Sequence, residues 1–185
     1  MAEYYLISQL PSLDGISESM PLPITSERFE ELCHGLLGKK AKAGLGELTL
    51  APQREHEKAS SALIGRWNEG ERGLRLALAK LRAEKMNKSF DAQTQQLPAE
   101  LLHAARTAVE TENPMEAEKL LNKYRLDFLE TLRPTDSFSE EYVFYYGLKL
   151  KLLERMRKFD LQSGEAAYRN IYDSIMYGDR TEVIL

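Results

Sequence analysis

The sequence predicts an all-α fold. Apolar residues recur at three- and four-residue steps over most of the chain, which is the spacing of one helix face. Residues that cap helices, and prolines that begin or end them, stand at several of the boundaries this spacing indicates. No run of alternating apolar and polar residues beyond residue 10 supports a β-sheet. We therefore expect one helical domain over residues 1–185, a bundle of about six or seven helices joined by short loops.

The first fifth of the chain predicts two helices separated by an irregular segment. Residues 3–10 suit either a short strand or one buried helix face, and we favour the helix. Residues 11–25 contain three prolines, a glycine and several serines, which is typical of irregular structure. Ser26 is expected to cap the second helix, and Gly38 to end it in a left-handed conformation. Its apolar face comprises Phe29, Leu32, Cys33, Leu36 and Leu37.

A connection and then a long helix are expected in the middle of the chain. Residues 39–52 hold three lysines, two glycines and Pro52, so we expect a connection containing at most a short helix. Within residues 53–88 a helical stripe is formed by Leu63, Ile64, Trp67, Leu74, Leu78 and Leu81. Gly70 and Gly73 interrupt it, and each costs about 1 kcal/mol relative to alanine in a helix. Either one weakened or bent helix or a hairpin of two helices fits, and the single helix is favoured.

Three helices are expected after a polar loop near residues 89–97. Pro98 is placed in the first turn of a helix through Val109, and Asn113 caps a helix that begins with Pro114. The segment 137–140 repeats the capping pattern before the most apolar helix, whose wide apolar arc predicts a central position. A last helix is expected to open at 163–164 and to end near residue 178. Its apolar residues are Tyr168, Ile171, Tyr172, Ile175 and Met176.

Composition narrows the function classes. The 25 basic and 29 acidic residues give a net charge of −4, which argues against a dedicated nucleic-acid-binding protein. The single cysteine, Cys33, cannot form an internal disulfide, so a cytoplasmic location is expected. The first residues lack the basic start of a signal peptide. No uncharged run approaches the roughly 20 residues of a membrane helix, so any membrane role is expected to be peripheral.

Sequence motifs for catalysis or metal binding are missing. Residues 35–40 have the wrong glycine spacing for a phosphate-binding loop, and His56 lacks a second histidine at position 60. Cys33 and His34 are adjacent, so a helix points their side chains about 100° apart. We expect no catalytic residue, no cofactor, no metal site and no small-molecule substrate.

Basic residues concentrate in the second half of the long helix. We call this set the basic ridge: Arg72, Arg75, Lys80, Arg82, Lys85 and Lys88. Either it is a solvated helix face, or it docks an acidic partner helix, with polyanion binding as a variant. The aromatic residues Tyr142, Phe144, Tyr145 and Tyr146 are expected to pack in the core rather than to stack on a ligand.

Three stretches resemble a known family: residues 4–11, residues 67–83 and residues 145–160. They are similar to a short bacterial family of uncharacterised proteins that is encoded beside subunits of vacuolar/archaeal-type (V/A-type) rotary ATPases. That family itself resembles a shortened form of the C-type central-stalk protein of these ATPases, called d in eukaryotes. Four residues, Glu71, Leu74, Arg75 and Arg82, match the acid-then-Leu-Arg pattern of the helices in that central-stalk protein.

The resemblance implies a mechanical rather than a chemical role. It implies an all-α bundle related to the helical repeat of the central-stalk protein, at the cytoplasmic face of the membrane, that contacts the central axle and the membrane rotor ring. The expected function is a non-enzymatic subunit or an assembly protein of such an ATPase. The alternative is a helical adaptor that binds an acidic protein or nucleic acid through the basic ridge. The partner-binding residues expected are Glu71, Arg72, Arg75, Arg82 and Lys85, and Tyr4 and Tyr5 are expected to anchor the N-terminal segment against the C-terminal helices.

Overall fold

The structure is a computed structural model, and it describes residues 2–16, 20–54, 58–90, 97–158 and 161–177. Within these ranges the chain forms eight α-helices and no strand, which confirms the predicted all-α class. The helices are α1 (Ala2–Gln9), α2 (Ser26–Leu36), α3 (Lys39–Leu45), α4 (Ala62–Lys85), α5 (Ala99–Glu110), α6 (Pro114–Thr131), α7 (Glu140–Arg157) and α8 (Leu161–Tyr177). The short helix α3 lies in the segment predicted to be a connection.

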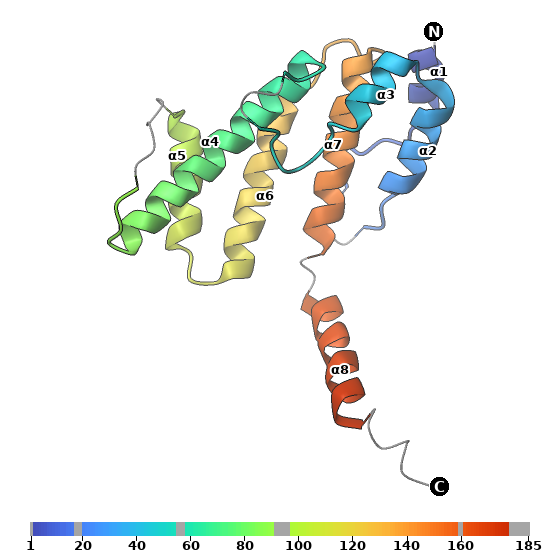
Figure 1. The fold of residues 1–185 in the computed structure, drawn as a ribbon. Helices are drawn as coiled ribbons and strands as arrows, with labels where there is room; N and C mark the ends of the chain where they lie inside the picture. The colour runs from blue at the N-terminus through green and yellow to red at the C-terminus, as the bar shows by residue number, and fades with distance from the viewer. Residues whose placement is uncertain (1, 17–19, 55–57, 91–96, 159–160, 178–185) are drawn as a thin grey trace, which may run out of the picture.

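Helix α7 lies in the middle of the helical body. It contacts α1, α2 and α3 on one side and α4 and α6 on the other (Figure 1). Ten of its residues are buried, which confirms the central position predicted from its wide apolar arc. The aromatic rings of Phe144, Tyr145 and Tyr146 are among them, and Tyr142 packs against the core while only partly buried, so this aromatic group packs in the core as predicted.

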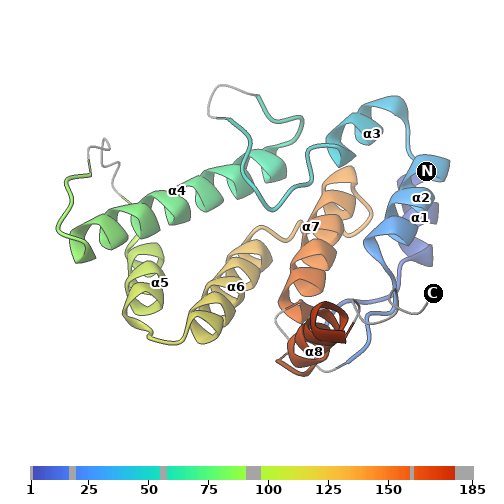
Figure 2. The same ribbon diagram turned by 60° about the horizontal axis from the view of Figure 1, so that its bottom comes forward.

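Two apolar clusters are joined by helix α4. The larger one gathers α1, α2, α3 and α7 with the first half of α4 and part of α6, and the smaller one joins the second half of α4 to α5 and α6 (Figure 2). The single 24-residue α4 confirms the favoured prediction over the hairpin. Gly70 permits its close approach to α6, because a Cβ there would lie 2.4 Å from a ring carbon of Phe128.

The helix caps confirm some predictions and correct others. Asn113 and Ser139 accept hydrogen bonds from the backbone N–H groups of Met115 and Tyr142, as their cap roles require. The prediction for Ser26 is wrong, because Thr25 caps α2. Ser26 instead donates through its N–H and its hydroxyl to Glu154 of α7, at 2.7 and 2.6 Å.

Two further boundaries differ from the predictions. Gly38 does not end α2 in a left-handed conformation; its φ is −72°, and it precedes the first turn of α3. Pro98 occupies the cap position of α5 rather than the first turn. Residues 11–16 and 20–25 contain no helix, as predicted for the irregular segment. Most of the loop predicted at 89–97 lies outside the described residues.

The N-terminal helix is anchored differently from the prediction. Tyr4 and Tyr5 are both exposed, and the fully buried residue of α1 is Leu6. The Tyr4 ring stacks on Phe138 with centroids 4.7 Å apart, just before α7 begins. The predicted anchoring role therefore belongs to Leu6, because its side chain is the one removed from water.

Helix α8 stands apart from the rest of the described chain. It follows α7 and extends away from the body (Figure 1). It makes no contact with any other helix among the described residues. In the part of the chain that the structure describes, no helix combines the length and hydropathy needed to cross a bilayer.

Candidate functional site

The five residues predicted to bind a partner all lie on α4, but they do not share one environment. The Glu71 side chain is 1% exposed, whereas that of Arg75 one turn later is 49% exposed. Arg82 and Lys85 are exposed, and Arg72 is half-buried. Glu71 therefore points into the body, and any role it has toward a partner is to position Arg75.

Glu71 is held by two arginines. Arg125 of α6 donates from Nε and from its terminal nitrogen to the two carboxylate oxygens, at 2.9 and 3.1 Å, in a bidentate pair. Arg75 donates from Nε to Oε1 of Glu71 at 3.0 Å. Because a bidentate arginine–carboxylate pair fixes direction as well as distance, this arrangement sets the rotation of α4 against α6.

The same network continues to α7. Arg125 donates to Oδ1 of the buried Asn122 at 3.1 Å and lies 3.5 Å from a carboxylate oxygen of Glu118. Glu118 also accepts from Arg155 of α7. The charges on α4, α6 and α7 thus form one connected set, which favours a single arrangement of the three helices.

Three members of the basic ridge also bind main-chain carbonyls. Arg72 donates to the carbonyl of Gln53 at 3.0 Å, and Lys85 donates to the carbonyl of Val109 at 3.0 Å. Arg75 reaches the carbonyl of Leu50 at 3.5 Å. Arg82 is exposed and forms no ion pair within the described ranges. The ridge therefore holds the 50–53 segment and the end of α5 as well as presenting positive charge to solvent.

A second charged cluster ties the segment after α1 to α6 and α7. Lys149 is 8% exposed, and its Nζ lies 2.6 Å from Oδ1 of Asp14 and 2.7 Å from Oε1 of Glu130. The Tyr145 hydroxyl donates to the other oxygen of Glu130 at 2.8 Å. Arg133 adds a contact to Asp14 at 3.3 Å. This cluster fixes residues 11–16, which have no helix of their own, onto the core helix.

The ionisation of the second cluster follows from its geometry. Burial alone would lower the pKa of Lys149, but the hydrogen bonds to Asp14 and Glu130 outweigh it and the pKa is raised. The hydrogen bond from Lys149 lowers the pKa of Asp14 despite partial burial. Burial, and then the hydrogen bond to Glu130, raises the pKa of Tyr145 to about 12. Lys149 is therefore a protonated cation that positions helices, not a free amine.

Alkaline conditions should weaken this cluster. A pKa raised in the folded state gives stability that is fully present below the unfolded pKa, about 10 for tyrosine, and is lost as pH rises toward the folded value of about 12. We expect Tyr145→Phe to cost about 1 kcal/mol at pH 8 through the lost hydrogen bond, and to make the fall in stability from pH 10 to 12 shallower. Urea unfolding at pH 8 and 11 measures this. Tyr4→Phe, at an exposed tyrosine, serves as the control. If the free energy of unfolding fell equally with pH for the unsubstituted protein and both variants, the raised pKa of Tyr145 would not be the cause.

An open groove of about 580 Å³ lies between α2 and α7. Its walls carry charges of both signs, from Glu27, Glu30, Lys151, Glu154, Arg155 and Lys158, and they also include Ser26 and Leu50. The carboxylate of Glu30 lies 3.0 Å from Lys151, and that of Glu154 accepts from Ser26. These contacts hold α2 against α7. The side chains of Glu30, Lys151 and Glu154 therefore already have partners within the protein.

The nucleophile and ligand candidates from the sequence are dispersed. Burial, with a smaller contribution from Glu30, raises the pKa of the Cys33 thiol to about 12, so the thiol is protonated at neutral pH. His34 is exposed, and His56 lies outside the described residues. No group of three side chains with metal-ligand chemistry gathers in the described ranges.

Two of the important charged residues were missed by sequence reasoning. Arg125 follows Leu121 by four residues and precedes Leu129 by four, so it occupies a position on the apolar stripe of α6. Lys149 stands between two leucines in the most apolar helix. A lone cation on an apolar stripe is a usable signal for a buried ion pair, because charged residues are almost never buried unless paired.

Comparison with known proteins gives one family match. The model of the family described as "Protein of unknown function (DUF2764)" matches residues 84–179, more than half of the 185 residues. The matched region contains α5, α6, α7 and α8 and the last residues of α4. No curated protein and no solved structure matches the chain.

Proposed function

We propose that this chain, which belongs to the family described as "Protein of unknown function (DUF2764)", is a non-enzymatic subunit or assembly protein of a V/A-type rotary ATPase. In this proposal it works by protein docking at the cytoplasmic face of the membrane, between the central axle and the rotor ring. The resemblance of residues 4–11, 67–83 and 145–160 to the family encoded beside such ATPases motivates the proposal.

The observation that carries the proposal is the construction of α4. Glu71 is fixed from inside by Arg125, while Arg75, Arg82 and Lys85 are exposed on the same helix. A protein that transmits force needs a helix whose charged surface cannot rotate or slide against its neighbours. A buried bidentate pair provides such a fixed orientation, and the exposed basic side chains supply groups that an acidic partner helix would contact.

The arrangement of the three resembling stretches supports the same proposal. They fall largely on α1, α4 and α7, and α7 contacts both of the others. The resemblance therefore covers one continuous part of the body rather than scattered surface segments. The alternative, a helical adaptor that binds an acidic protein or nucleic acid through the basic ridge, is less well supported, because Arg72 and Lys85 are engaged with carbonyls of the chain itself.

Charge reversal at Arg75 tests the docking surface. We expect Arg75→Glu to weaken binding to purified axle subunits or to the detergent-solubilised rotor ring by at least about tenfold, because an attraction across the interface becomes a repulsion. The variant should stay folded, since Arg125 still holds Glu71. Biolayer interferometry with the full chain gives the affinities.

The matched control is Arg66→Glu. Arg66 is also exposed on α4, and nine residues separate it from Arg75, which places it on the opposite face of the helix. An equal loss of binding affinity for the two variants would indicate an effect of net charge rather than of the position of Arg75. Unchanged affinity for Arg75→Glu would remove α4 from the interface, and a steep loss of binding with salt would favour the adaptor alternative.

A further inference from the structure

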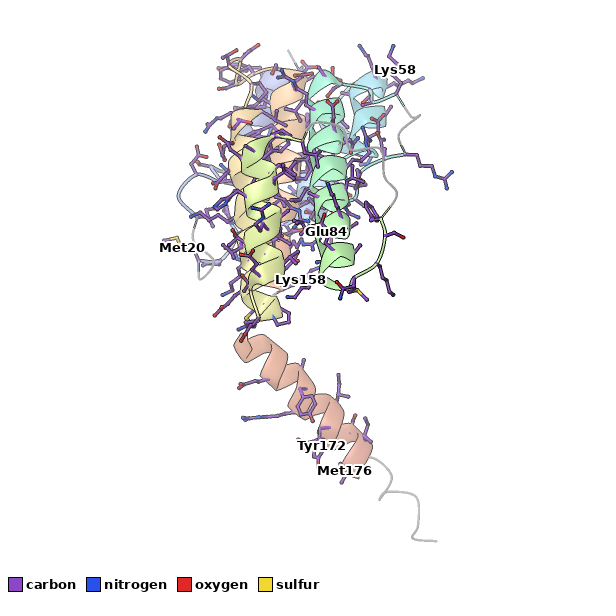
Figure 3. All side chains as sticks on the ribbon, turned by 90° about the vertical axis from the view of Figure 1, so that its left-hand side faces the viewer. Met20, Lys58, Glu84, Lys158, Tyr172 and Met176 are labelled. Carbon is purple, nitrogen blue, oxygen red and sulfur yellow. The ribbon has the colours of Figure 1, made fainter. Side chains whose placement is uncertain are left out.

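Helix α8 carries an apolar face that nothing in the described chain covers. Five large apolar side chains on it are between 47% and 71% exposed: Tyr168, Ile171, Tyr172, Ile175 and Met176. Figure 3 shows Tyr172 and Met176 on the helix well beyond the body. The family match extends through residue 179, so α8 belongs to the matched region and is not an appended tail.

The two faces of α8 are sharply different. Residues 168, 171, 172 and 175 follow one another at three- and four-residue spacing and so form one stripe, on which the Tyr168 and Tyr172 rings stack at 6.1 Å. The charged residues Glu165, Arg169 and Asp173 stand four residues apart beside it. The stripe exposes roughly 600 Å² of mostly apolar surface, at the upper end of the largest patch on a typical monomer.

We propose that α8 pairs in an antiparallel manner with α8 of a second copy of this chain. A two-fold axis between residues 171 and 172 sets Tyr168 against Ile175 of the other copy, and Ile171 against Tyr172. The stripe is then complementary to itself, with an aromatic ring opposite a β-branched side chain at each step. This is the self-complementarity that a two-fold interface requires.

The charges favour the same arrangement. In the antiparallel register Arg169 of each copy and Asp173 of the other lie on the same side of the interface, within one residue of equal height along the axis. A parallel pairing does not bring these opposite charges together. Pairing the stripes also buries roughly 1,200 Å² in total, the lower limit of stable protein interfaces.

A lipid surface fits α8 less well than a second copy does. Helices that lie on membranes carry lysine and arginine on the polar face to meet anionic lipid. The described polar face of α8 has one arginine against two acids. This inference concerns α8 alone and holds or fails independently of the ATPase proposal.

Sedimentation velocity of the full chain over a range of concentrations tests the pairing. We expect a dimer, and we expect Ile175→Asp to raise its dissociation constant at least about 100-fold, because each dimer carries the buried charge twice. The fold of the body should be unchanged, since α8 contacts no other helix in the described residues. Asn170→Asp, which adds the same charge on the polar face, is the matched control and should leave the dimer intact.

The orientation is tested by exchanging charges. Arg169→Asp should weaken the dimer about three- to tenfold, and adding Asp173→Arg to it should restore the affinity. A chain that is monomeric at all concentrations overturns the inference, as does a dimer that Ile175→Asp leaves intact. Failure of the double variant to restore affinity overturns the antiparallel register. A monomer that binds vesicles of phosphatidylcholine and phosphatidylserine through α8 would replace the second copy with a lipid surface.

Discussion

Arg125→Met should lower the free energy of unfolding by about 3–5 kcal/mol, because removing one partner of a buried ion pair leaves the other charge uncompensated. Glu71 is 1% exposed and loses both hydrogen bonds that Arg125 donates to it. Arg75 remains, but it holds Glu71 through one bond from an exposed position. Methionine keeps much of the apolar volume of arginine, so the loss of stability comes from the unpaired charge of Glu71 rather than from a cavity. Urea unfolding followed by circular dichroism measures it.

Two further variants distinguish the contribution of the Glu71–Arg125 pair to stability from the contributions of packing and of Arg75. Glu71→Leu combined with Arg125→Met should recover much of the loss, since no buried charge is then left unpaired. Arg75→Ala removes only the half-exposed partner and should cost about 0.5 kcal/mol. A double variant as unstable as Arg125→Met would show that packing, not charge, makes this site sensitive.

Trp67→Ala should also cost about 3–5 kcal/mol, the usual loss when a large aromatic side chain is deleted from a core. Trp67 is 1% exposed and its ring lies 6.3 Å from that of Phe128 in α6. Its indole N–H donates to the carbonyl of Thr49 at 3.1 Å, in the segment that links α3 to α4. The substitution therefore loosens both the core and this irregular segment. Thermal unfolding and chemical denaturation would give the loss.

The conservative variant at the same position isolates the hydrogen bond. Trp67→Phe keeps most of the apolar contact and leaves the Thr49 carbonyl without its partner, so we expect a loss of about 1–2 kcal/mol. Proteolysis of the segment between α3 and α4 should become faster in both variants. A loss below about 1 kcal/mol for Trp67→Ala would contradict the place given to this residue in the core.

Much of the fold follows from local signals in the sequence. The cap at Asn113, the proline after it and the glycine-containing α4 were predictable because each depends on residues close together in the chain. The cap of α2 was misplaced by one residue: Thr25 accepts from the N–H of Arg28, and the neighbouring Ser26 donates to Glu154, a residue 128 positions later. Gly38 likewise adopts the conformation that the next helix requires rather than the one that glycine alone permits.

The candidate site was predictable only in part. The spacing of Glu71 and Arg75 indicated a pair on one helix, but it could not tell which of them faces inward. That depends on Arg125, 54 residues away, which competes for the same carboxylate. The five apolar residues of α8 were expected from their spacing, whereas their exposure could not be, because an amphipathic stripe does not identify what covers it.

The proposal of a rotary ATPase subunit is tested most directly by asking what stays bound to the protein in a membrane fraction of its native cells. The chain is tagged at its chromosomal locus and recovered from native membranes, and the proteins retained after a moderate salt wash are quantified by mass spectrometry. We predict rotor-ring and axle subunits in a fixed ratio to the tagged chain, and fewer of them with Arg75→Glu than with Arg66→Glu. Their absence beside a different, reproducible partner would contradict the proposal and favour the adaptor alternative.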